Sequence, residues 1–98
     1  NRFKSPRPLA EYVKSRIPPD ASVYVYQSTM SDFNFYAGRE EIAVVPSPQA
    51  LERLRAQSKE SYLLIDEKHL TEIAQNPALP LVAERQIGNR KWYLLKLR

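Results

Sequence analysis

A continuous apolar segment in the second half of the chain, residues 61–66 (SYLLID), constrains the fold more than any other feature. Its four inner residues are tyrosine, two leucines and isoleucine, with no alternation of polar and apolar positions. Strands that are apolar on both faces are typical of the interior of a parallel sheet, where helices cover both sides. The segment therefore predicts a central strand of an α/β domain.

Two earlier segments also predict buried strands. Residues 22–27 (SVYVYQ) alternate β-branched and aromatic side chains, so both faces are apolar, and residues 42–45 (IAVV) form a short apolar run. Near the end of the chain, residues 81–87 (LVAERQI) and 90–97 (RKWYLLKL) flank Gly88-Asn89, a dipeptide suited to a two-residue hairpin turn. The chain is thus expected to end in an antiparallel pair.

Helical signals lie between these strands. Ser47 and Asp66 stand where the N-caps of two helices are expected, and residues 29–38 predict a short helix closed by Gly38. The first helix is predicted to end before Pro18, after apolar side chains at helical spacing: Leu9, Tyr12, Val13 and Ile17.

Alternating strands and helices, with connections too long for hairpins, predict a mostly parallel sheet with helices on both faces. We therefore expect one α/β domain over residues 1–98. Its architecture is predicted to be a three-layer α/β/α sandwich with about five strands, ending in an antiparallel β-hairpin.

The residue types present argue against several kinds of catalytic or cofactor site. Gly38 and Gly88 are the only glycines, so neither a dinucleotide-binding turn nor a phosphate-cradling loop can be built. There is no cysteine, and His69 is the only histidine; we interpret it as a solvated or capping residue at a helix start. Glu40 and Glu41 are adjacent, so on a strand they would point to opposite faces. No catalytic residue, metal site or cofactor is predicted.

Positive charge is concentrated at the two ends of the chain. The formal net charge is +4, and ten of the fifteen Lys and Arg residues lie in residues 1–20 and 85–98, whereas the middle is acidic. This pattern suggests that the termini lie near an anionic surface, although solvated surface cations would give the same pattern. Nucleic acid is not the expected partner, because the basic residues do not line one helix and no RNP-like strand is present.

The order of these segments resembles a known family. The helix, the SVYVYQ strand, the FNFYAGR turn and the strands IAVV, SYLLID and KWYLLKL are similar to the C-terminal soluble domain of bacterial membrane glycosyltransferases of the GT-C class. These are relatives of the dolichyl-phosphate-mannose protein mannosyltransferases and of the aminoarabinose transferase that modifies lipid A. The resemblance covers nearly the whole chain and includes one short signature: Phe35, Tyr36, Gly38 and Arg39.

The resemblance implies a non-catalytic accessory domain on the extracytoplasmic (periplasmic) side of the bacterial inner membrane. The parent enzyme would transfer a sugar from a polyprenyl-phosphate carrier, and its catalytic carboxylate would lie in a transmembrane part outside this sequence. The chain begins at Asn1 without an initiator methionine, so we expect it to be a piece of a longer protein. It has no apolar run of about 18 residues that would span a bilayer. Its partners would be that transmembrane part and the membrane surface, with a lipid-linked sugar or acceptor as a further candidate.

Two groups of residues are candidate contacts. The basic run Arg2, Lys4 and Arg7 would lie beside lipid headgroups. Tyr36 and Arg39 have two interpretations: they close a corner of the core, with Arg39 paired to an acid, or they offer a stacking face and an anion donor to a sugar or phosphate. The alternative function for the whole chain is a free-standing α/β module that binds a small ligand or a protein.

Overall fold

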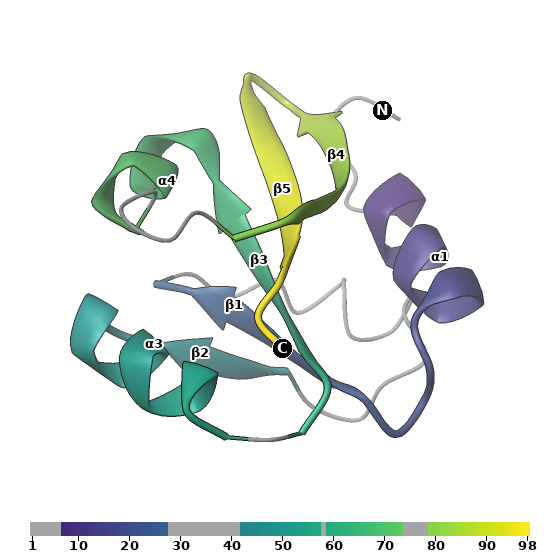
Figure 1. Ribbon diagram of the computed structural model, residues 1–98. Helices are drawn as coiled ribbons and strands as arrows, with labels where there is room; N and C mark the ends of the chain where they lie inside the picture. Colours follow the sequence, from purple (N-terminus) through teal and green to yellow (C-terminus); the bar gives the residue numbers. More distant parts are fainter. Residues whose placement is uncertain (1–6, 28–41, 58, 74–78) are drawn as a thin grey trace.

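The computed structural model describes residues 7–27, 42–57, 59–73 and 79–98, and it contains one five-stranded sheet in the order β2-β1-β3-β5-β4 (Figure 1). The elements in chain order are α1 (Arg7–Arg16), β1 (Ser22–Tyr26), β2 (Ala43–Val45), α3 (Pro48–Arg55), β3 (Ser61–Asp66), α4 (Glu67–Ile73), β4 (Leu81–Ile87) and β5 (Arg90–Lys96).

The sheet is mixed, with its parallel part first in the chain. Strand β1 pairs in parallel with β2 on one side and β3 on the other, whereas β5 pairs antiparallel with both β3 and β4. Strand β5 therefore runs opposite to the other four. The turn between β4 and β5 consists of Gly88 and Asn89, and Gly88 has the positive φ of 66° that such a turn requires. The predicted α/β class and closing hairpin are confirmed.

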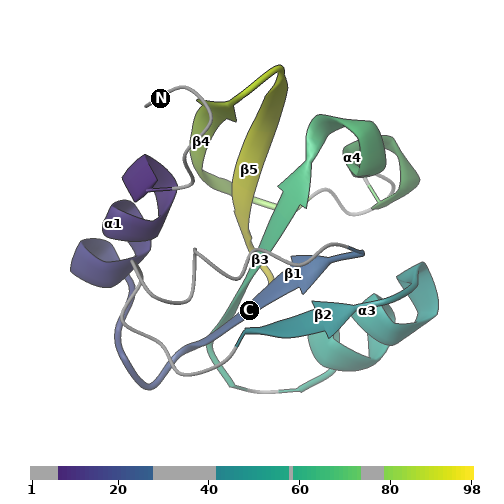
Figure 2. The same ribbon diagram turned by 180° about the vertical axis from the view of Figure 1, so that it is seen from behind.

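Helices cover both faces of the sheet. Figures 1 and 2 show α1 on one side and α3 and α4 on the other. The apolar stripe of α1, which includes Leu9 and Val13, packs against one face of β1, β3 and β5. Leu51 of α3 and Ile73 of α4 pack against the opposite face. The three-layer arrangement follows from these two separate cores.

Strand β3 is the centre of the sheet, as its apolar sequence predicts. All six of its residues are buried, and neighbouring side chains enter opposite cores: Leu64 faces α1, while Leu63 and Ile65 face α3 and α4. A strand can be apolar throughout only where both of its faces are covered.

Strand β2 differs from its prediction as a buried strand. It lies at an edge of the sheet, and although Val45 is buried, Val44 is 42% exposed. An edge strand is covered less completely than a central one, and a short β-branched run does not reveal which of the two it will become. The predicted helix of residues 29–38 lies outside the described residues.

Helix starts follow the predicted capping residues. The Ser47 hydroxyl accepts a hydrogen bond from the backbone N–H of Ala50 at 3.2 Å, and Pro48 occupies the first helical position of α3. None of the helices in the described ranges has the length and apolar character needed to cross a membrane.

Candidate functional site

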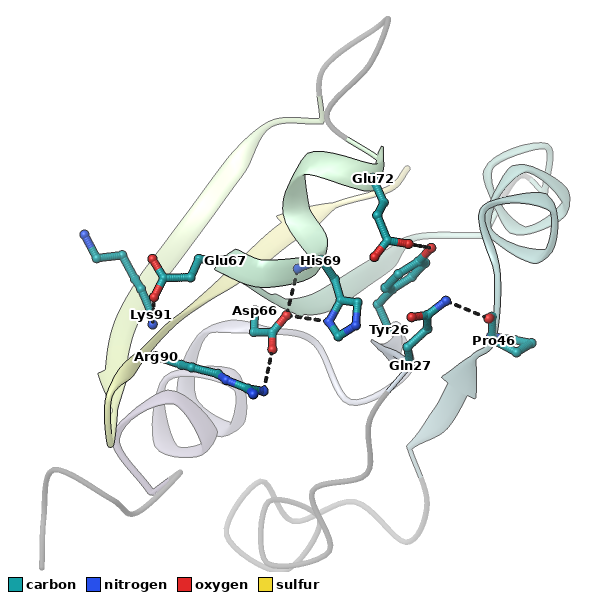
Figure 3. Close-up of polar contacts among 9 residues, drawn as sticks. All are labelled: Tyr26, Gln27, Pro46, Asp66, Glu67, His69, Glu72, Arg90 and Lys91. Carbon is teal, nitrogen blue, oxygen red and sulfur yellow. Dashed lines mark hydrogen bonds and ion pairs between the residues drawn. The ribbon is translucent and has the colours of Figure 1, made fainter.

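The parallel strands end together at one edge of the sheet. Strand β1 ends at Tyr26, β2 at Val45 and β3 at Asp66, and these ends lie side by side because the three strands are adjacent and parallel. Open α/β sheets bind their ligands at this edge. We call the polar group that gathers here the carboxyl-edge cluster; Figure 3 shows its members: Tyr26, Gln27, Asp66, His69, Glu72 and Arg90.

Asp66 is the centre of the cluster. Its side chain is fully buried and accepts three hydrogen bonds. Two come from His69, whose backbone N–H donates at 3.0 Å and whose Nδ1 lies 2.6 Å from the same oxygen, Oδ1. The third comes from Nη1 of Arg90, which donates to Oδ2 at 2.9 Å. The carboxylate therefore joins the end of β3 to the start of α4 and the start of β5.

Charge and hydrogen bonding decide the ionisation of this carboxyl group. Burial alone raises the pKa of Asp66, but the hydrogen bonds from His69 and the electrostatic effects of His69 and Arg90 outweigh burial, so the pKa is lowered from its usual 3.8. Asp66 is therefore an ionised acceptor at neutral pH. Because donors already surround it, the group is suited to holding neighbouring side chains in place and not to donating a proton.

His69 is more enclosed than the sequence predicts. Its side chain is 16% exposed, with its ring edge-on to the ring of Tyr26 at a centroid distance of 5.8 Å. Of the two predicted alternatives for His69, solvated or capping, the structure does not support the solvated one, because the ring is mostly enclosed. The prediction that Asp66 caps the following helix is confirmed by the bond from the His69 N–H. Within the described ranges, the second ring nitrogen, Nε2, has no hydrogen-bond partner.

Tyr26 and Gln27 form the side of the cluster that belongs to β1. The buried Tyr26 hydroxyl donates to Glu72 at 3.4 Å, and burial followed by the Glu72 charge raises the pKa of this phenol. Gln27 has a φ of 53°, a left-handed conformation that costs a non-glycine residue about 1 kcal/mol or more. Its side chain donates to the carbonyl of Pro46 at 3.0 Å, and its backbone N–H donates to the carbonyl of Val45, so the end of β2 and the residue after it hold Gln27 in this conformation.

A second contact attaches the hairpin to α4. The backbone N–H of Lys91 donates to Oε1 of Glu67 at 3.1 Å, next to the ion pair of Arg90 with Asp66. The start of β5 is thus held at two consecutive residues by the end of β3 and the first residue of α4, as Figure 3 shows.

Most residues singled out from the sequence cannot be compared with this cluster. Tyr36, Arg39, Arg2 and Lys4 lie outside the described residues. Arg7 is the first residue of α1, where its Nε lies 3.1 Å from Oε2 of Glu11 on the exposed side of the helix. No group of three His, Asp or Glu side chains within the described ranges could hold a metal ion.

Sequence reasoning identified Asp66 as a cap but missed the ion-paired group around it. An acidic residue at the end of a buried strand with a histidine three positions later was the available signal. Arg90 gave none, because its approach to Asp66 depends on β5 pairing with β3. No family model, curated protein or solved structure matches the chain.

Acid is expected to weaken the contribution of Asp66 to stability only below about pH 5. Since the folded pKa is lower than 3.8, Asp66 is ionised in both states near neutral pH and its contribution is complete. As the pH falls through 3.8, the unfolded chain takes up the proton first, which favours unfolding until the folded carboxyl group is protonated as well. Unfolding free energies of the wild type and Asp66→Asn should differ by a constant amount above about pH 5 and converge at lower pH. A constant difference across the whole acid range would contradict the assignment.

Proposed function

We propose that the chain is a non-catalytic, extracytoplasmic accessory domain of a membrane glycosyltransferase that uses a polyprenyl-phosphate sugar donor. The family resemblance of the sequence motivates the assignment, and the α/β fold with its closing hairpin is compatible with it. In this proposal the transmembrane part of the same protein carries out the transfer, and the domain lies beside it at the periplasmic membrane surface.

One observation supports a non-catalytic role. Asp66 is a buried carboxylate at the edge where α/β folds place their sites, yet it is fully engaged by His69 and Arg90. A general acid or base must exchange a proton with a substrate, and its pKa is best placed near the working pH. The pKa of Asp66 is instead lowered, and its oxygens already have donors. The cluster instead holds the end of β3, the start of α4 and the start of β5 together.

The isolated 98-residue chain is expected to transfer no sugar. Incubation with polyprenyl-phosphate sugars and candidate acceptors should give no product above a heat-denatured control, because the proposed catalytic carboxylate belongs to the transmembrane part. Transfer is measured as radiolabel that passes from the labelled donor to the acceptor. A membrane preparation with known transferase activity serves as the positive control for the donor. Turnover by the chain that disappears in Asp66→Asn would contradict the proposal and make the cluster an active site.

The second candidate is a free-standing α/β module that binds a small ligand or a protein. The observation in its favour is the strained Gln27 beside the carboxyl edge, because residues in sparsely populated backbone conformations concentrate at binding sites. The coding sequence upstream of Asn1 distinguishes the two candidates. About ten or more apolar spans are expected for the accessory domain, and a short leader without such spans would favour the module.

Tyr36 and Arg39 stay a prediction within this proposal. If they contact a lipid-linked sugar or an acceptor, Arg39→Ala should lower the activity of the full-length enzyme with little effect on the melting temperature of the domain. If Arg39 is instead a paired structural residue, the same substitution should lower the stability of the domain by about 1 to 3 kcal/mol.

A further inference from the structure

Three cations gather around two tyrosine rings on the α1 side of the sheet. The guanidinium carbons of Arg16 and Arg85 lie 5.6 and 5.7 Å from the centroid of the Tyr12 ring. The Nζ atom of Lys96 lies 6.0 Å from the ring centroid of Tyr62. We call these five residues the tyrosine–cation surface.

Elements from both ends of the chain form this surface. Tyr12 and Arg16 belong to α1, Arg85 to β4 and Lys96 to β5, while Tyr62 lies in β3. Both ribbon views show α1 beside β4 (Figures 1 and 2). The two rings belong to one layer, because Tyr62 is part of the core under α1 and Tyr12 packs against that core. The fold therefore brings together positive charges that are far apart in the sequence.

The cations of this surface are exposed and have no carboxylate partner among the described residues. Arg16, Arg85 and Lys96 are all exposed and make no ion pair there. Two other cations differ: Arg55 is paired with Glu52, and Lys91 with Glu84. The charge on the tyrosine–cation surface is thus available to an external anion.

Two acidic groups near this surface already have partners. Glu60 accepts a hydrogen bond from the Tyr62 hydroxyl, and this bond, burial and the Glu60 charge raise the pKa of Tyr62 to about 12, so the ring stays neutral beside Lys96. Glu11 is paired with Arg7. Arg85 also donates to the Glu84 carbonyl at 2.6 Å, which restrains its guanidinium in place.

We infer that the tyrosine–cation surface docks the domain on a bilayer by binding the phosphate groups of anionic phospholipids. The half-buried Tyr12 is the ring that can meet lipid, because tyrosine is favoured at the headgroup level, while arginine and lysine contact lipid phosphates. In the sequence, Arg2 and Lys4 add two further positive charges ahead of α1. This inference rests on the proposed function, which places the domain at a membrane surface.

The expected affinity is low without a tether. Each cation near an anionic bilayer strengthens partitioning roughly fivefold (about 1 kcal/mol), so three cations give on the order of a hundredfold. A transmembrane helix in the same chain would raise the effective concentration of the domain to about millimolar, which makes such weak binding sufficient to orient it.

Vesicle flotation with the 98-residue chain tests the inference. The wild type should float with phosphatidylglycerol vesicles at low salt, should be released as the Debye length falls to about 8 Å, and should not bind phosphatidylcholine vesicles. The double variant R16Q/R85Q should bind about 30-fold more weakly, and Lys96→Gln about fivefold. The matched control R53Q/K68Q removes the same charge from α3 and α4 on the opposite layer and should stay within about threefold of the wild type.

Several outcomes would overturn the inference. Equal losses of vesicle binding in R16Q/R85Q and R53Q/K68Q would mean that net charge, and not this surface, attracts the bilayer. Equal binding of the wild type to phosphatidylglycerol and phosphatidylcholine vesicles would mean that anionic headgroups are not the ligand, and so would the absence of any binding at the lowest salt. If the wild type binds a 20-nucleotide RNA or DNA more tightly than vesicles, and R16Q/R85Q loses that binding, the tyrosine–cation surface is a nucleic-acid surface instead. Melting curves verify that each variant is folded. If R16Q/R85Q is unfolded, the vesicle binding of Lys96→Gln tests the inference in its place. The sugar-transfer assay and the upstream coding sequence use no vesicles, so they test the proposed function separately.

Discussion

Replacing Asp66 with alanine is expected to lower the free energy of unfolding by about 2 to 4 kcal/mol, because a buried carboxylate that accepts three hydrogen bonds and caps a helix is lost. The substitution removes three hydrogen bonds at once. The half-exposed Arg90 can turn to water, but the His69 ring is largely enclosed and α4 loses its N-cap. Urea unfolding, followed by circular dichroism, measures the loss.

Two control substitutions separate charge from packing. Asp66→Asn keeps an oxygen that can accept the capping bond but loses the negative charge, so about 1 to 3 kcal/mol is expected. Glu52→Ala removes an exposed carboxylate from its pair with Arg55 and should cost about 0.5 kcal/mol or less. A loss below about 1 kcal/mol for Asp66→Ala would mean that the cluster is not a structural tie, and the non-catalytic assignment would lose its main support.

The parts of the fold that the sequence predicts are those determined by local chemistry. The apolar run of β3 requires cover on both faces, wherever the strand lies in the sheet. Ser47 and Asp66 cap helices because their side chains reach backbone N–H groups three residues away. Gly88 adopts the positive φ of a hairpin turn with no steric cost. None of these features depends on distant residues.

The parts that sequence reasoning missed depend on strand order. In the sheet, strand β5 lies between β3 and β4. In the chain, however, both α4 and β4 stand between β3 and β5. That position brings Arg90 to Asp66, 24 residues away, and Lys91 to Glu67. No local periodicity encodes this arrangement. For the same reason the environment of His69 could not be predicted, because Tyr26 reaches it from β1.

The tyrosine–cation surface could be predicted only in part from the positions of the charged residues in the sequence. The sequence shows positive charge at both ends of the chain but not which of these cations lie close together. The structure places α1 beside β4 and brings Arg16 and Arg85 to the ring of Tyr12. From the sequence, Tyr12 is predicted only as part of the apolar stripe of α1. Its contact with Arg85 could not be predicted, because Arg85 belongs to another element, β4. Its contact with a bilayer stays a proposal.

Alanine substitutions of two neighbouring leucines, Leu63 and Leu64, are expected to cost about 2 to 5 kcal/mol each, the range for deleting a buried leucine side chain. Both leucines are fully buried, but they lie in different cores: Leu63 under α3 and α4, Leu64 under α1. Leu81→Ala makes the same chemical change at a position that is 54% exposed and should cost about 0.5 kcal/mol or less.

The comparison between the two leucines tests the three-layer architecture itself. Side chains of consecutive strand residues point to opposite faces of a sheet, so in a two-layer fold one of these leucines would face solvent. Large losses for only one of them in chemical unfolding would show that one face of the sheet is uncovered in solution. Comparable losses for both require helices on both faces. In that case Asp66, at the end of the same strand, is held at the carboxyl edge by two independently packed cores.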